Sequence, residues 1–160
     1  MDKLTPKETS KGAEEIVLTQ IKQDFITPAN AIFDYVDMVE KVLNNAELTS
    51  EDEIAQIKSS CNHLIEQYEV AFLQNTGINA ETSKKTPEEY SELRHNLRTP
   101  LNAIIGYSEI LMEDYEDDLE ESALEDFQQI INLARETEKA IEIFVDYIRG
   151  ESIDPNNDNA

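Results

Sequence analysis

Residues 94–111 read RHNLRTPLNAIIGYSEIL and place one histidine, His95, five residues before Pro100. Apolar side chains recur through this stretch at three- and four-residue steps, which indicates an amphipathic helix. The expected inward positions are Leu93, Leu97, Leu101, Ile104, Ser108 and Leu111. Because proline has no N–H, the helical hydrogen bond to the carbonyl of Asn96 is lost at Pro100. The sequence therefore predicts a disturbed helical turn beside an outward-facing histidine.

A second, weaker copy of this pattern lies upstream, where residues 23–36 read QDFITPANAIFDYV. Aligning Thr27 with Thr99 gives an offset of 72 residues, and six of the fourteen positions are then identical. Gln23 stands where the downstream copy has His95, so the upstream copy lacks the imidazole. We interpret the chain as a tandem repeat in which only the second copy is chemically active.

The first half of the chain predicts a helical hairpin over residues 14–77. Its first helix runs from the start of this range to Leu43. The inward positions of that helix are Val17, Leu18, Ile21, Phe25, Ala29, Ile32, Val36 and Val39. Ser50 and Glu53 form a capping box that begins the second helix, and Gly77 is expected to end it.

The second half predicts a matching hairpin over residues 86–150. Thr86 is expected as the N-cap of its first helix, because a proline and two glutamates follow it. An acidic stretch then forms a solvated turn. Ser122 and Glu125 repeat the capping box, and the last helix ends before Gly150.

Neither hairpin can bury its apolar face alone, whereas two hairpins that face each other can. The predicted fold is therefore all-α: a four-helix bundle made of two tandem helical hairpins. Residues 1–13 and 151–160 are expected to be flexible ends. The linker between the hairpins is long enough for them to pair within one chain or between two chains.

Composition excludes several classes of function. A net charge of −22 over 160 residues argues against binding to nucleic acid or to an anionic membrane surface. The sequence shows no signal peptide and no apolar run long enough for a membrane span, so we expect a cytoplasmic protein. The single cysteine, Cys61, excludes an intrachain disulfide and is expected in the core, and His63 is expected at the boundary of the core.

The surroundings of His95 favour nucleophilic chemistry. The outward side of its helix is expected to carry His95, Arg98, Asn102, Ile105 and Glu109. An exposed imidazole is largely neutral at cellular pH, so one ring nitrogen is free to accept a phosphoryl group and to pass it to a carboxylate. Arg98 lies one turn away, is absent from the upstream copy, and is expected to offset the phosphate charge.

Residues 94–111 closely resemble the H-box of two-component sensor histidine kinases, in their dimerisation and histidine phosphotransfer domain. The resemblance continues in register, more weakly, over residues 87–150. It implies that His95 is the phosphoacceptor and that Thr99 assists water in dephosphorylation of the partner. It also implies that a response-regulator receiver domain docks on the helix face below the histidine, at Asn102, Ile105, Gly106 and Glu109.

Three departures from that family limit the expected activity. Asn96 stands where the family usually has an acidic base, so efficient autokinase chemistry is not expected. The residues after Gly150 carry no ATP-binding domain, so we expect no self-sufficient kinase. The upstream hairpin can supply in cis the half of the bundle that family members gain by homodimerisation, which favours a monomeric pseudo-dimer over a homodimer.

These observations favour a phosphotransfer module that exchanges a phosphoryl group between His95 and the aspartate of a receiver domain. The donor is then a histidine kinase or a phosphorylated receiver, and the chain itself binds no cofactor or metal, with Mg²⁺ expected on the receiver. One alternative is a non-catalytic docking or regulatory bundle, and another is the N-terminal input module of a larger signalling protein. Because Thr27 and Asn30 survive in the upstream copy, a role in the fold alone is open for Thr99 and Asn102.

Overall fold

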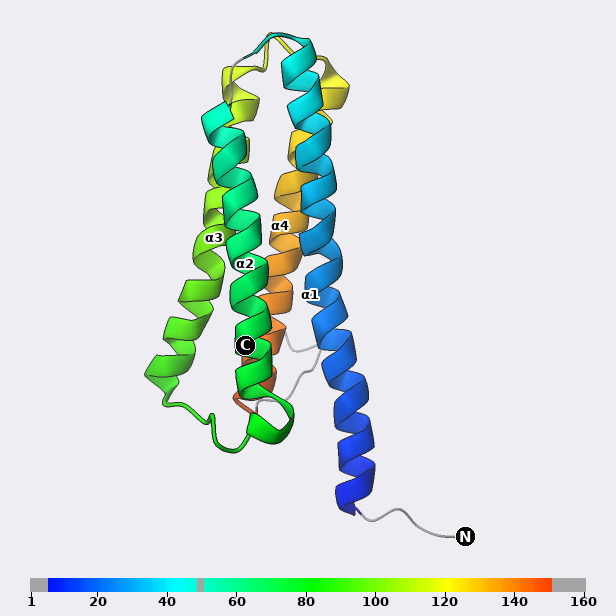
Figure 1. The fold of residues 1–160 in the computed structure, drawn as a ribbon, viewed down its shortest axis with the longest axis vertical. Helices are drawn as coiled ribbons and strands as arrows, with labels where there is room; N and C mark the ends of the chain where they lie inside the picture. The colour runs from blue at the N-terminus through cyan, green and yellow to red at the C-terminus, as the bar shows by residue number, and fades with distance from the viewer. Residues whose placement is uncertain (1–5, 49–50, 151–160) are drawn as a thin grey trace.

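The computed structural model describes the backbone of residues 6–48 and 51–150, and side chains from residue 12 onward. Its four long helices are α1 (Pro6–Asn45), α2 (Glu51–Asn75), α3 (Pro87–Asp114) and α4 (Glu121–Ile148), with a short 3-10 helix, η1 (Gly77–Asn79), after α2. Each long helix runs antiparallel to the next along the chain (Figure 1). The described part of the chain is a four-helix bundle, as predicted.

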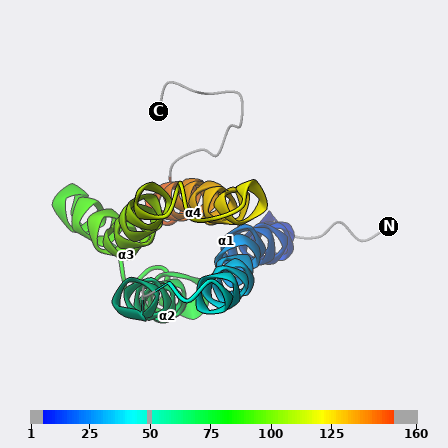
Figure 2. The ribbon, with the colours of Figure 1, turned by 90° about the horizontal axis from the view of Figure 1, so that it is seen from above.

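The two hairpins pack against each other within this one chain. Viewed from above, the helices form a ring in which α1 neighbours α4, α4 neighbours α3, and α3 neighbours α2 (Figure 2). The packing of α1 on α4 is more extensive than its packing on α2, the helix that follows it in sequence. The apolar face of each hairpin is therefore covered mainly by the other hairpin.

The core follows the predicted 3.6-residue pattern. On α3 the inward positions Leu97, Leu101, Ile104, Ser108 and Leu111 are buried, and Leu93 packs at the edge of the core. The two hairpins bury the same positions at offsets of 72 residues between α1 and α3 and 73 residues between α2 and α4. The matched pairs include Ala29 with Leu101, Ile32 with Ile104, Ile57 with Ile130, and Cys61 with Ala134.

Local signals explain three of the helix ends. Thr86 is the N-cap of α3: its side chain accepts a hydrogen bond from the N–H of Glu89, whose carboxylate accepts one from the N–H of Thr86. Gly77 and Gly150 have φ of +64° and +85°, a conformation that favours glycine after a helix. The N-cap predicted at Thr86 is thus confirmed, as are glycines at both hairpin ends.

Other predicted helix starts differ from the structure. The N-cap of α4 is Glu120, without a side-chain cap, so the box predicted at Ser122 and Glu125 is wrong. Two backbone N–H groups, those of residues 118 and 119, donate to the carbonyl of Tyr115. This turn ends early enough for Ser122 to lie inside the first helical turn. The other predicted box includes Ser50, which lies outside the described residues.

The start of α1 also differs from the prediction. The helix begins at Pro6 and therefore covers residues 6–13, which we expected to be a flexible extension. Its N-terminal end continues past the end of the bundle (Figure 1). Val17 is 37% exposed and Leu18 is only half-buried. These two positions were predicted to face the core, but they lie near the last part of α1 that the bundle covers, since Glu14 lines a groove with the ends of α2 and α4. The remaining expected ends, residues 1–5 and 151–160, lie outside the described part.

Candidate functional site

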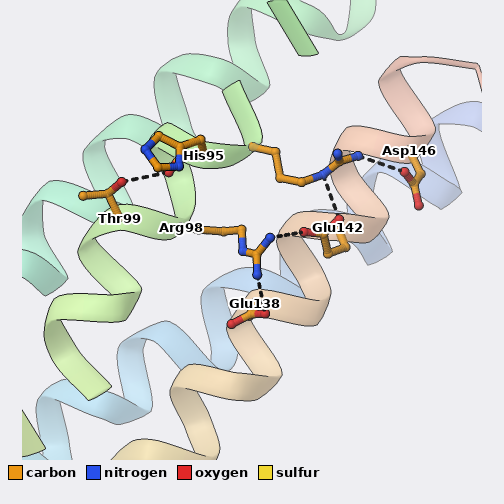
Figure 3. A network of polar contacts seen from close by, with 7 residues as sticks. His95, Arg98, Thr99, Glu138, Glu142 and Asp146 are labelled. Carbon is orange, nitrogen blue, oxygen red and sulfur yellow. Dashed lines mark hydrogen bonds and ion pairs between the residues drawn. The ribbon is translucent and has the colours of Figure 1, made fainter. Parts of the chain in front are cut away.

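His95 lies exposed on the outer side of α3, five residues before the buried Pro100. Helix α3 continues through Pro100, although its ring cannot donate the hydrogen bond that the carbonyl of Asn96 would otherwise accept. Thr99 Oγ1 donates to the carbonyl of His95 over 2.9 Å, as Figure 3 shows. The imidazole is open to solvent. The helical turn that carries it has lost the backbone hydrogen bond to the carbonyl of Asn96 and has gained the hydrogen bond from Thr99 to the carbonyl of His95.

Two arginines of α3 connect this turn to α4 (Figure 3). Arg98 Nη2 lies 3.1 Å from Glu138 Oε1, and Arg98 Nη1 lies 3.6 Å from Glu142 Oε1. Arg94 Nη2 lies 3.5 Å from Asp146 Oδ1. Arg94 Nε lies 2.8 Å from Glu142 Oε2 but its N–H is not aligned with that oxygen, so this contact is an ion pair and not a hydrogen bond. Glu142 thus bridges both arginines.

This network, formed by Arg94, Arg98, Glu138, Glu142 and Asp146, is half-exposed. An isolated pair of this kind contributes about 0–1 kcal/mol, because water screens the charges. Five linked charges across two helices hold α3 beside α4 more effectively than one pair does. In Figure 3 the side chain of Arg98 points toward α4, so its charge is already balanced by carboxylates in this state. Its expected action on a phosphoryl group stays a prediction.

The remaining predicted residues share the outer face of α3. Asn96, Asn102 and Glu109 are exposed, and Ile105 and Gly106 are half-buried. Apart from the adjoining residues and the nearby backbone of α3 itself, no described atom lies within 4 Å of the position that a Cβ on Gly106 would take. Packing within the chain therefore does not require glycine there.

Residues 88–153 match the family model of the His Kinase A (phospho-acceptor) domain. The match begins one residue inside α3 and includes all of α4, so it covers the hairpin that carries His95. It confirms the resemblance drawn from residues 94–111 and supports a phosphoacceptor or dimerisation role in two-component signalling. Comparison with curated proteins and with solved structures gives no match. Within the described residues, every helix is too short or too polar to cross a membrane.

Two grooves flank α3 of the phospho-acceptor hairpin, and sequence reasoning did not predict either. The first lies between α2 and α3, has a volume of about 410 Å³, and is lined by residues that include Asn96, Leu93, Val70 and His63. His63 was expected at the boundary of the core, but it is exposed at this groove. Side chains from two separate helices form this groove, so periodicity along one helix could not reveal it.

The second groove lies between α3 and α4 and has a volume of about 420 Å³. It is farther from His95 along α3, toward the turn that connects the two helices. Glu109, which we predicted as a docking residue, is part of its lining. The predicted docking face therefore continues into this groove.

Proposed function

We propose that the chain is a histidine phosphotransfer module of two-component signalling, in which His95 exchanges a phosphoryl group with the aspartate of a receiver domain. The exposed imidazole of His95 on the phospho-acceptor hairpin carries this proposal. In the direction toward this chain, a neutral ring nitrogen attacks the phosphorus of the receiver's aspartyl phosphate. An N–P bond forms while the P–O bond to the aspartyl carboxylate breaks, and the carboxylate leaves with the electron pair.

The residues around His95 take distinct parts in this proposal. Mg²⁺ on the receiver balances charge on the transferred group, and this chain holds no cofactor. Arg98 is paired with Glu138 and Glu142 and must leave them before it can offset the charge of phosphohistidine. We therefore assign its contribution to the stage after transfer. While the O–H of Thr99 donates to the carbonyl of His95, its oxygen keeps lone pairs that can accept a hydrogen bond from water, which fits assistance to hydrolysis.

The phosphoryl donor in this proposal is another protein. Asn96 is exposed but cannot take a proton from an imidazole, so it supports no autokinase step. A histidine kinase acting in trans, or a phosphorylated receiver, therefore supplies the group. We further propose that the working unit is a monomeric pseudo-dimer, because each hairpin already covers the apolar face of the other within one chain. A solution mass of one chain by light scattering supports this, and a mass of two chains contradicts it.

A second candidate is a docking bundle that binds a receiver without transfer. The neutral Asn96 and the paired state of Arg98 favour it, since neither assists phosphorylation as placed. The two candidates differ in their need for the imidazole of His95.

The test is transfer from a panel of phosphorylated receiver domains, measured by intact mass, with His95→Gln as the matched control. We expect a gain of one acid-labile phosphoryl group on the wild type and none on the variant, with receiver binding equal in both. Binding without any gain of mass would leave the docking bundle and remove the transfer proposal.

A further inference from the structure

The groove between α2 and α3 lies between the two hairpins, on the side of the ring opposite the α1–α4 contact (Figure 2). Its volume of about 410 Å³ is within the range of about 300–1,000 Å³ that small-molecule sites have. The N-terminal part of α3 is inclined away from α2 (Figure 1). Val70 of α2 is 51% exposed and Leu93 of α3 is only half-buried, so the groove has apolar walls that the chain itself leaves partly uncovered.

Smaller side chains explain why this contact has a groove. The repeat makes the α2–α3 contact equivalent to the α1–α4 contact, and three aromatic residues of the latter are replaced by smaller residues. At offsets of 72 and 73 residues, Phe25 is replaced by Leu97, Phe144 by Ala71 and Tyr147 by Gln74. Because Phe25 and Phe144 are fully buried, the α1–α4 contact contains ring volume that the α2–α3 contact lacks. The groove therefore arises from a difference between the hairpins and not from the fold that they share.

One end of the groove carries a cation whose hydrogen-bond partners are neutral. Lys85 Nζ donates to Asn75 Oδ1 over 2.9 Å and to the carbonyl of Ser83 over 3.1 Å. An ammonium group has three N–H donors, so one is left for a ligand. The pKa of Glu89 is lowered chiefly by its hydrogen bonds with Thr86 and only last by Lys85, so that carboxylate does not neutralise the ammonium. This end of the groove is therefore suited to an anion.

The other end of the groove carries hydrogen-bond acceptors. Gln67 lines the groove eight residues before Asn75, a rise of about 12 Å along α2. Its Oε1 is buried and has no hydrogen-bond partner within the described part of the chain. Turning this half-buried amide toward the groove therefore costs no hydrogen bond of that oxygen. Among the described lining residues the only carboxylate is that of Glu66, also at this end, so the two ends of the groove differ in charge.

These features determine the chemistry of an occupant. We propose that the α2–α3 groove binds a small, elongated apolar acid that has a hydrogen-bond donor at the end opposite its carboxylate. The carboxylate accepts a charge-assisted hydrogen bond from Lys85, and Gln67 Oε1 accepts one from the donor. The chain between them covers Val70, Ala71 and Leu93 and removes their apolar surface from water.

The bound acid contacts α2 of the first hairpin and α3 of the second, so it binds only the assembled bundle. It therefore raises the thermal stability of the protein as its concentration increases. Asn96 lines the groove and directly follows His95 in the sequence. The predicted docking residues, Asn102, Ile105, Gly106 and Glu109, do not line this groove, so the site is separate from that face.

The experiment titrates the full chain with ω-hydroxydecanoate, a linear acid with a hydroxyl group at its far end, below its micelle concentration. Calorimetry gives the affinity and the stoichiometry, and thermal unfolding by circular dichroism gives the shift in Tm. The matched probes are decanoate, which lacks the hydroxyl, and the corresponding α,ω-diol, which lacks the carboxylate. The matched variants are Lys85→Gln, which removes the cation, and Lys84→Gln, which removes the adjacent, more exposed cation that pairs with Glu81.

We expect one ω-hydroxydecanoate per wild-type chain and a rise in Tm that saturates. Lys85→Gln should weaken binding at least fivefold, and Lys84→Gln should leave it unchanged. Decanoate is the more apolar acid, but it should bind at least threefold more weakly because it has no donor for Gln67, and this difference should vanish in Gln67→Leu. Gln74→Tyr places the ring of Tyr147 at the equivalent, exposed position and should weaken binding at least tenfold.

Equal binding by Lys85→Gln and Lys84→Gln, or binding of the diol as tight as that of the acid, would overturn the assignment of the carboxylate to Lys85. Uptake of many molecules per chain without saturation, or no binding of any probe, would refute the site itself. A wild-type homodimer that Gln74→Tyr separates would make a second copy of the chain the occupant and would overturn the inference. None of these measurements depends on phosphoryl transfer, so failure of the proposed function and failure of this inference are observed separately.

Discussion

Replacing Ser108 with alanine should stabilise the protein. Ser108 is fully buried on α3, and its Oγ has no hydrogen-bond partner within the described part of the chain. Val36, its equivalent on α1, is also fully buried and carries no polar atom in its side chain. A buried serine on a helix commonly donates to the carbonyl four residues back. Thr137 of α4 does so, to the carbonyl of Leu133 over 2.8 Å, whereas Ser108 has no such bond.

The size of the effect follows from these contacts. An unpaired hydroxyl in an apolar environment costs about 1–3 kcal/mol, and Ser108→Ala removes that cost. Alanine also has the higher helix propensity, by about 0.5 kcal/mol. The lost dispersion contacts of one oxygen and the small void act against the gain. We expect a net increase in the free energy of unfolding of about 1–2 kcal/mol, with a rise in Tm of about 2–4 °C for each kcal/mol.

The measurement is urea unfolding followed by circular dichroism at 222 nm, with Thr137→Val as the matched control. Because the hydroxyl of Thr137 is bonded, its removal should give no comparable gain. Phosphoryl transfer to His95 should be unchanged in Ser108→Ala, since residue 108 faces the core and not the docking face. A loss of stability in Ser108→Ala would show that its hydroxyl has a partner, and would refute the reasoning.

Two further predictions concern α3. Gly106→Ala should raise the free energy of unfolding, measured by urea titration, by about 0.5–1 kcal/mol, because glycine weakens a helix interior and the space for a methyl group is open. The same variant should lower the rate of phosphoryl transfer from a receiver. An unchanged rate would remove Gly106 from the docking face. The pKa of Glu89 is lowered, chiefly by the hydrogen bond from the backbone N–H of Thr86. The ionised carboxylate of Glu89 therefore stabilises the fold above the ordinary carboxyl pKa, and this effect is lost as pH falls through the lowered value. Glu89→Gln should make the free energy of unfolding less dependent on pH in that acidic range. An unchanged pH profile would contradict this assignment.

The inward and outward faces of α3 could be predicted from sequence because they depend on one helix alone. A 3.6-residue period fixes which side of α3 is apolar, and His95 then lies opposite Leu97 and Leu101. The period does not fix how far neighbouring helices extend. For this reason Val17 and Leu18 fit the pattern of α1, and yet neither is buried.

The partners of side chains at the surface could not be predicted in the same way. Arg98 pairs with Glu138, which lies 40 residues away on another helix, so its neighbours depend on how α4 packs against α3. The two grooves beside α3 have the same origin, since each needs side chains from two helices. The N-cap of α4 was predicted incorrectly because a serine three residues before a glutamate occurs inside a helix as well as at its start.

The two hairpins are alike in the core and unlike at the surface around His95. Ile26 stands where α3 has Arg98, and it packs against the core. Ile65, Glu69 and Leu73 stand where α4 has Glu138, Glu142 and Asp146, so the first hairpin keeps only one of the three carboxylates that contact the arginines. The shared core positions are enough for the hairpins to complete one bundle, because burial depends on apolar volume and not on surface charge.

An aromatic layer joins the first hairpin to α4 at the level of Gln23. The rings of Phe25 and Tyr68 stack with centroids 3.6 Å apart, and Tyr68 contacts the ring of Phe144 with centroids 4.9 Å apart. Helix α3 supplies no ring to this layer; it is held at that level by Leu97 inside the bundle and by the arginine network outside. The first hairpin therefore contributes rigid packing beneath the site, which leaves the outer face of α3 free to carry His95 and to contact a partner.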